Sequence, residues 1–363
     1  MKSDKFIPQM EPSIDDKEAN AVQEYLSSSP WLTEFKKTEE FENMLCKYTG
    51  SKYCVVVTNG TISLTLALLA CGVGVGDEVI VPNLTMIATP NSAKLIGAEP
   101  VFVDVNKENL CMNLDEAEKA ITEKTKALIY VSLNGRTENP LVVKEFCDKH
   151  NIAFIEDAAQ SLGSFYDGKH IGTFSDIGSI SFSAPKIITT GQGGALLTNN
   201  VKLYDKLKKL KDFGRDSGGN DIHDTIGYNF KFTDLQAVIG IEQMKKLESR
   251  VKRKKEMYKL YYQNLKDVEG IEFISTDLNI VAPWFIDIYT NDPDKLIAYL
   301  KDQNIGSRKI YPPINKQKAY KISETFLVTE EYTSKGLWLP SSVRLTDEEI
   351  NNICNTIKEF FGR

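Results

Sequence analysis

The stretch Ser181-Phe-Ser-Ala-Pro-Lys-Ile-Ile-Thr-Thr-Gly-Gln-Gly-Gly194 begins as an apolar strand and breaks into a glycine-rich loop. Its one lysine, Lys186, stands where the strand ends, and taken alone it could simply be solvated. Two other strand ends carry matching chemistry. Asp157 closes Ala153-Phe-Ile-Glu-Asp157, and Asn59-Gly60-Thr61 follows Cys54-Val-Val-Val-Thr58. We therefore expect an amine, a carboxylate and a phosphate-binding turn at one site.

The region around these residues alternates short β-rich runs with helical patterns, from about residue 53 to residue 200. Several runs are apolar at consecutive positions, as strands covered on both faces must be. The alternation predicts an α/β fold with a mostly parallel sheet, in which ligands gather beyond the carboxyl ends of the strands. The predicted strands are residues 54–57, 78–81, 101–104, 127–131, 153–156, 177–182 and 195–198.

The C-terminal part of the chain predicts a second, smaller α+β lobe. A long helical pattern from about Thr233 to Leu265 leads into it, residues 271–274 and 284–289 resemble strands, and helices begin near Asp292-Pro293 and at Thr346. We place the boundary near residue 250, which gives a large N-terminal domain of residues 1–250 and a small domain of residues 251–363.

Composition excludes several classes of protein. The 44 basic and 50 acidic side chains are interspersed and give a net charge of −6, which does not favour nucleic acid or an anionic membrane as partner. The six cysteines lack Cys-x-x-Cys spacing and the three histidines are far apart, so we expect no metal site and no disulfide framework. The stretch Met1-Lys-Ser-Asp-Lys-Phe6 lacks the apolar core of a signal peptide, and no apolar run could span a bilayer, so we expect a cytoplasmic protein.

The groups at the strand ends match what pyridoxal 5'-phosphate requires of a protein. Lys186 would form the Schiff base, so that a substrate enters by imine exchange, and would then shuttle its proton. Asp157 would keep the pyridine nitrogen cationic, although a strand-end turn or a helix cap is a common role for aspartate. The phosphate would accept from N–H groups of Gly60 and Thr61 at a helix start, with the Ser181 hydroxyl as a further donor.

Two more side chains complete the expected cofactor pocket. Gln160 could donate to the phenolic oxygen of the ring, and Met86 could cover one ring face. Other glycine-rich segments do not fit nucleotide binding. Gly72-Val-Gly-Val-Gly76 lies after a helix and before a strand, and Gly191-Gln-Gly-Gly194 lacks the lysine of a P-loop.

With these residues in place, the chain resembles the DegT/DnrJ/StrS sugar aminotransferase family, pyridoxal phosphate enzymes of fold type I. The resemblance covers nearly the whole chain, and its many ordered matches make it specific. It is carried by Trp31-Leu-Thr33, Thr58-Asn-Gly-Thr61, Gly76-Asp-Glu-Val-Ile-Val-Pro82, Gly97-Ala-Glu-Pro-Val-Phe-Val-Asp104, Ile155-Glu-Asp-Ala-Ala-Gln160, Ser181-Phe-Ser-Ala-Pro-Lys186, Thr189-Thr-Gly-Gln-Gly-Gly194 and Ile226-Gly-Tyr-Asn-Phe-Lys-Phe-Thr233.

The resemblance implies the roles given above and adds Asn229, which matches an asparagine that reaches the phosphate from the neighbouring subunit. It therefore implies a homodimer with shared active sites. The implied reaction moves an amino group from glutamate, through pyridoxamine 5'-phosphate, to a keto-deoxysugar linked to a nucleotide, for surface polysaccharide or glycoconjugate synthesis. A dehydratase branch of the group has histidine in place of Lys186, so the lysine favours the aminotransferase.

Departures from the family pattern lie where the acceptor should bind. Met86 replaces a usual aromatic ring, Leu133-Asn-Gly-Arg-Thr137 replaces an aromatic-Gly-His sequence, and Tyr311-Pro-Pro-Ile-Asn315 has asparagine where histidine is common. Arg136 is either a fixed cation for phosphate or carboxylate, or a surface loop residue. The first interpretation would suit a smaller acceptor, such as a phosphorylated keto triose. The candidate substrate-binding residues are Asn134, Arg136, Tyr311 and Asn315.

Three functions remain open on the sequence. The leading hypothesis is the aminotransferase. The second is a lyase that eliminates hydroxyl from a deoxysugar precursor, and the third is a non-catalytic relative that binds cofactor or sugar for regulation. The intact set of lysine, aspartate and phosphate-binding residues favours an enzyme over the third.

Overall fold

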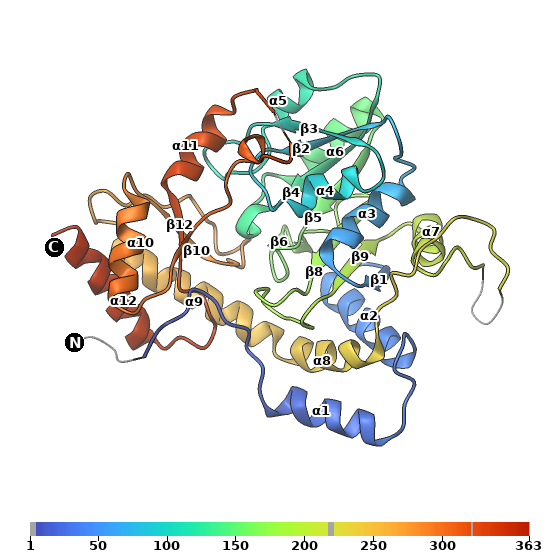
Figure 1. Ribbon diagram of the computed structural model, residues 1–363, viewed down its shortest axis with the longest axis horizontal. Helices are drawn as coiled ribbons and strands as arrows, with labels where there is room; N and C mark the ends of the chain where they lie inside the picture. The colour runs from blue at the N-terminus through green and yellow to red at the C-terminus, as the bar shows by residue number, and fades with distance from the viewer. Residues whose placement is uncertain (1–4, 217–220, 321, 363) are drawn as a thin grey trace.

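The computed structural model describes residues 5–216, 221–320 and 322–362 (Figure 1). Residues 1–4 lie outside this range. They belong to the N-terminal stretch, residues 1–6, for which we expect no signal peptide. Within the described residues, no helix is long and apolar enough to cross a membrane. The same residues hold no group of three or more His, Cys, Asp or Glu side chains suited to a metal ion.

The large lobe is built on a seven-stranded sheet in the order β1-β9-β8-β5-β4-β2-β3. Strand β9 is antiparallel to both of its neighbours and the other pairs are parallel, which confirms the predicted sheet. Each of the seven strands predicted for this sheet is present, with ends within two residues of those expected. The strands are β1 (Tyr53–Val57), β2 (Glu78–Pro82), β3 (Glu99–Val103), β4 (Thr125–Val131), β5 (Ala153–Asp157), β8 (Ile177–Ser181) and β9 (Gly194–Thr198).

Helices cover both faces of this sheet, as the apolar runs require. Successive residues of β1 show the two faces: Val55 and Val57 pack with α3, whereas Cys54 and Val56 pack with α2 and α8. The elements of the large lobe outside the sheet are α1 (Asp16–Ser27), α2 (Lys36–Thr49), α3 (Gly60–Ala70), α4 (Ala88–Lys94), α5 (Leu114–Lys119), η1 (Leu133–Gly135), α6 (Pro140–His150), β6 (Phe165–Tyr166), β7 (Lys169–His170), α7 (Val201–Lys211) and α8 (Asp234–Lys245).

The second lobe carries a three-stranded antiparallel sheet in the order β10-β12-β11, packed against helices (Figure 1). The predicted strand at residues 271–274 makes only a single bridge, from Glu272 to Tyr289. The elements are α9 (Leu247–Leu265), β10 (Ile286–Tyr289), α10 (Pro293–Asp302), β11 (Arg308–Lys309), η2 (Ile314–Lys316), α11 (Leu327–Lys335), β12 (Gly336–Leu339) and α12 (Asp347–Phe360).

The long helix predicted between Thr233 and Leu265 is two helices, α8 and α9, which meet at Lys246. Residue 250 falls in the first turn of α9, so a continuous helix crosses the predicted domain boundary. That boundary stays a prediction. The expected starts of the later helices are confirmed. Pro293 opens α10, and Thr346 caps α12 in a capping box with Glu349.

Six of the seven sheet strands run in the same direction, so their carboxyl ends share one edge. The segments that follow these strands therefore meet at that edge. They include the start of α3 after β1, the loop with Met86 after β2 and η1 after β4. Asp157 ends β5 and Lys186 follows β8. This edge is where ligands of such sheets bind.

Candidate active site

The start of α3 has the geometry predicted for a phosphate-binding turn. The Asn59 side chain accepts from the Ile62 N–H at 3.0 Å and so fixes the first helical turn. The N–H groups of Gly60 and Thr61 have no acceptor within the helix, as is general for a first turn. A Cβ added to Gly60 would lie 3.1 Å from the Ser181 Cβ. Glycine thus lets the Ser181 hydroxyl approach the helix start, and the three predicted phosphate-binding residues come together.

Asp157 is a buried carboxylate whose hydrogen-bond donors are neutral. Its side chain is 6% exposed, accepts from Thr89 Oγ1 at 2.8 Å and accepts from the Ala159 N–H at 3.2 Å. Burial raises the pKa of Asp157, while hydrogen bonds and the charge of Lys186 act in the opposite direction. A protonated ring nitrogen would add a cationic donor to these two neutral ones. The residue therefore fits the cofactor role predicted for it.

Lys186 lies against an aromatic ring that the sequence did not indicate. Its Nζ is 3.9 Å from the ring centroid of Trp284. The indole Nε1 donates to the Pro185 carbonyl at 2.8 Å, which fixes the ring beside the lysine. Burial lowers the pKa of Lys186 to about 8, with the charge of Asp157 opposing and that of Arg308 adding to the effect. Roughly a tenth of the amine is then neutral at pH 7, as a nucleophile must be.

Gln160 is oriented by the segment that follows β4. Its Oε1 accepts from the Asn134 N–H at 2.6 Å, and its side chain is buried. A carboxamide has one acceptor end and one donor end, so this bond leaves Nε2 as the donor. A donor is what the predicted contact with the phenolic oxygen of the cofactor requires.

Arg136 is held inside the protein and is not a surface loop residue. It is 2% exposed, and its Nη1 and Nη2 donate to the two carboxylate oxygens of Asp287 at 3.1 and 2.8 Å. The Asn134 amide is occupied as well, because its Nδ2 donates to the Phe285 carbonyl at 2.7 Å. Neither side chain is presented to a ligand in this arrangement, which does not favour the expected acceptor contacts.

The side chain of Asn315 is also occupied by hydrogen bonds within the protein, whereas Tyr311 packs near the ring of Trp284. The Asn315 N–H and Oδ1 pair with the side chain of Asn83, each at 2.9 Å, and its Nδ2 donates to Glu330 at 2.9 Å. Tyr311 stands 6.5 Å from Trp284, ring centre to ring centre, and burial raises the pKa of its phenol. Of the four candidate substrate-binding residues, Tyr311 is the one near Lys186, because both side chains lie close to the ring of Trp284.

Met86 and Asn229 lie on more open parts of the chain. Met86 is 45% exposed, in the loop that leads from β2 to α4. Asn229 is exposed and forms a backbone bridge to Asp212, in the segment that joins α7 to α8. Figure 1 shows an arm of this segment that extends beyond the body of the molecule.

Three residues near the site were not identified from the sequence. Thr89, in α4, donates to Asp157, and Trp284 covers Lys186. Arg308, in β11, is exposed and lies with its guanidinium carbon 4.6 Å from the ring centroid of Trp338. Its charge lowers the pKa of Lys186. Each of these reaches the site from an element distant in sequence, and no local pattern marks it.

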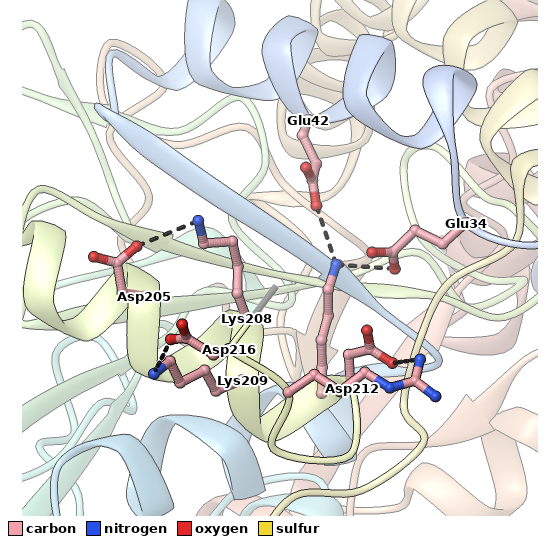
Figure 2. Close-up of a pocket in the computed structure, with 9 residues that line it drawn as sticks. Glu34, Glu42, Asp205, Lys208, Lys209, Asp212 and Asp216 are labelled. Atoms are coloured by element: carbon pink, nitrogen blue, oxygen red, sulfur yellow. Dashed lines mark ion pairs between the residues drawn. The ribbon is translucent and has the colours of Figure 1, made fainter. Parts of the chain in front are cut away.

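A separate cavity of about 590 Å³ has a different chemistry (Figure 2). Its charged side chains are paired with one another: Glu34 and Glu42 both point at the Lys211 ammonium, at 2.9 and 3.5 Å. Ligand pockets are usually apolar with a few polar groups, so this cavity is a poor candidate. It is lined by Glu34, Glu42, Asp205, Lys208, Lys209, Lys211, Asp212, Arg215 and Asp216.

The chain is similar in sequence and in fold to known proteins. Residues 12–358 match the DegT/DnrJ/EryC1/StrS aminotransferase family. The chain is 36% identical to the GDP-perosamine synthase of Escherichia coli O157:H7 over 99% of each chain. It is 31% identical to that of Vibrio cholerae over 98% of this chain and 100% of the other. PseC of Helicobacter pylori, an aminotransferase involved in the biosynthesis of pseudoaminic acid, superposes with a TM-score of 0.91 at 27% identity, covering 99% of this chain and 100% of PseC.

Proposed function

We propose that this chain, which belongs to the DegT/DnrJ/EryC1/StrS aminotransferase family, transfers an amino group from glutamate to the keto group of a nucleotide-linked deoxysugar. The chain is a pyridoxal phosphate-dependent aminotransferase with the fold of type I enzymes, and the predictions of family, fold, enzyme class and cofactor are confirmed. The amino donor, the acceptor and the site residues belong to the proposal. The placement of Lys186 at the same sheet edge as Asp157 and the start of α3 is the observation that carries it.

The residues at the sheet edge would hold the cofactor. Bound pyridoxal phosphate supplies an electrophilic aldehyde and a ring that withdraws electrons. Lys186 would bind the aldehyde and move the substrate proton, and Asp157 would hold a proton on the ring nitrogen. Gln160 would donate to the ring oxygen. The phosphate would be bound by Gly60, Thr61 and Ser181, and Met86 would pack on the ring face.

A homodimer with shared sites is part of the proposal. Asn229 would reach the phosphate of a second subunit, which accounts for an exposed asparagine in the segment that joins α7 to α8. The exposed apolar side chains of Ile222 and Ile226 in the same segment would be covered by that subunit. We also propose a cytoplasmic location, since sugar nucleotides of this kind would be made there.

A nucleotide-linked sugar is the acceptor that we favour. Two relatives are GDP-perosamine synthases, and their alignments extend along nearly the whole chain. The alternative of a small phosphorylated ketose rested on Arg136 as a free cation, and that guanidinium is paired with Asp287. Arg308, exposed above the Trp338 ring and close enough to influence Lys186, is a better candidate for an anionic group of donor or acceptor. The sugar dehydratase is disfavoured because Lys186 is present.

Half-reactions test the proposal directly. The enzyme is loaded with pyridoxamine 5'-phosphate and offered GDP- or dTDP-linked 4-keto-6-deoxysugars and small phosphorylated ketoses, while the visible absorption band of the cofactor is followed. Return of the band with a nucleotide-linked keto sugar, together with a stoichiometric amino sugar, supports the proposal. Return with only a small ketose would select the alternative. Elimination without amino product would select the lyase, and no half-reaction with any amino donor would select the non-catalytic relative.

A further inference from the structure

The carboxylate of Asp287 accepts hydrogen bonds from side chains of both lobes. Asp287 lies in β10 and is 3% exposed. It accepts from Arg136 Nη1 and Nη2 at 3.1 and 2.8 Å, from Asn134 Nδ2 at 2.9 Å and from the Tyr289 hydroxyl at 2.9 Å. A fork-shaped pair of this kind fixes geometry as well as charge. Arg136 is further held by its Nε, which donates to the Asn109 carbonyl at 3.1 Å.

Asn134 links this carboxylate to the backbone of the second lobe. Its Nδ2 donates to the Phe285 carbonyl at 2.7 Å, and the Phe285 N–H donates to its Oδ1 at 2.6 Å. The residue has φ 57° and ψ 25°, in the left-handed region that asparagine adopts more readily than most residues. Four hydrogen bonds to three residues therefore hold Asn134 in this conformation: one to Asp287, two to the backbone of Phe285 and one to Gln160.

The hydrogen bond from Asn134 to Gln160 connects these contacts to the proposed cofactor site. The left-handed turn at Asn134 aims its N–H at Gln160 Oε1, at 2.6 Å. If this backbone rotated, the carboxamide of Gln160 would lose the bond that distinguishes its two ends. Either end could then face the ring oxygen, and only the amide nitrogen can donate.

We propose that Asp287, Arg136 and Asn134 are positioning residues that set the donor end of Gln160 toward the cofactor. This inference rests on the proposed role of Gln160 as the contact to the ring oxygen. It assigns to Asn134 and Arg136 a task other than substrate binding. It also ties the placement of the small lobe to the cofactor, because β10 supplies the carboxylate on which the turn depends.

A double-mutant cycle tests the coupling. The variants are Asp287→Asn, Gln160→Ala and the two combined, measured as holoenzyme. The readouts are the pH midpoint of the visible cofactor band and the dissociation constant of the cofactor. Each single variant should shift the midpoint in the same direction and weaken cofactor binding roughly tenfold, the value of one hydrogen bond to a charged group. The combined variant should match Gln160→Ala alone, because the two residues act on one contact.

Two further variants keep the result interpretable. Asp294→Asn breaks an exposed ion pair with Lys309 in the same lobe and should change neither readout. Asn134→Gly suits a positive φ but removes the side-chain bonds to Phe285 and Asp287, so it replaces Asp287→Asn in the cycle if that protein does not fold.

The outcomes separate this inference from the proposed function. A wild-type protein without a cofactor band would overturn both. A band that Gln160→Ala leaves unchanged would overturn the role of Gln160 and the inference that rests on it. A folded Asp287→Asn protein whose effects add to those of Gln160→Ala, or that binds cofactor like the wild type, would overturn the inference alone.

Discussion

Asp157 and Asp287 are both buried carboxylates, yet their surroundings differ. Asp157 accepts two neutral hydrogen bonds, from Thr89 and Ala159, and burial raises its pKa. Asp287 accepts four bonds, two of them from the guanidinium of Arg136. A carboxylate without a direct cationic partner is available to a ligand, whereas a saturated one holds the fold together. The difference favours Asp157 over Asp287 as the carboxylate that binds the proposed cofactor directly.

The largest effect is expected at the lysine beside the unsaturated carboxylate. Lys186→Ala should lower aminotransferase activity by roughly 10³-fold or more, because the residue would both bind the cofactor and move the proton. The visible cofactor band should be lost while the protein stays folded. Lys144→Ala, which removes an exposed ion pair with Asp148, is the matched control and should retain activity. Activity within tenfold of wild type in Lys186→Ala would contradict the assignment.

Asp157→Asn should separate catalysis from stability. Activity should fall by about 10²-fold or more, because a neutral amide cannot keep the ring nitrogen protonated. The apoprotein should be as stable as the wild type or more so at pH 7. The pKa of Asp157 is higher in the folded protein than in the unfolded chain. The free energy of unfolding therefore falls as pH rises from the unfolded pKa to the folded pKa, because the folded state resists ionisation. The amide of the variant does not ionise and escapes this loss. Denaturant unfolding without cofactor measures this, and a large loss of stability would place Asp157 among the structural residues.

Asp287→Asn should lose more stability and less activity than Asp157→Asn. Removing one partner of a buried ion pair leaves the other charge uncompensated, and the expected loss of unfolding free energy is about 3–5 kcal/mol. Activity should fall less than in Asp157→Asn when both are assayed well below their unfolding temperatures. Urea unfolding of the two variants side by side makes the comparison. Equal stability of the two proteins would remove the distinction drawn between the carboxylates.

The smallest effect concerns pH. Lys186 has a pKa of about 8 in the protein without cofactor, so its neutral fraction rises roughly tenfold between pH 6 and 7 and levels off above pH 9. The rate at which apoprotein gains the visible cofactor band should follow this curve. Arg308→Gln should move the midpoint to higher pH by about half a pH unit or less, because an exposed positive charge that opposes protonation is removed. A midpoint near pH 10 in the wild type would contradict the assigned environment of Lys186.

The placement of the candidate cofactor residues could be predicted because each follows a strand that the local pattern reveals. Asp157 ends an apolar run, Lys186 follows another, and Gly60 opens a helix after a third. Once the sheet is parallel, these positions must share an edge. The sheet and its strand limits came from the same pattern of apolar residues.

The acceptor side could not be predicted in this way. Arg136 and Asp287 are separated by 151 residues, and Asn83 and Asn315 by 232. A polar side chain in a loop has the same local pattern whether it faces a ligand or a distant partner. Trp284 and Thr89 escaped notice for the same reason, since nothing near them in sequence indicates Lys186 or Asp157.

By itself, the order of residues determined the alternating strands and helices, the parallel sheet and the chemical groups at its carboxyl edge, because periodic burial is a local property of the chain. Only the folded molecule decided which polar groups stay available. The side chains of Asn134, Arg136 and Asn315 pair with polar or charged groups of remote segments. Asp157 accepts bonds from neutral donors of Thr89 and Ala159, and Lys186 lies against the Trp284 ring. Hydrogen bonds and desolvation depend on which segments come together, and that is fixed only when the two lobes pack.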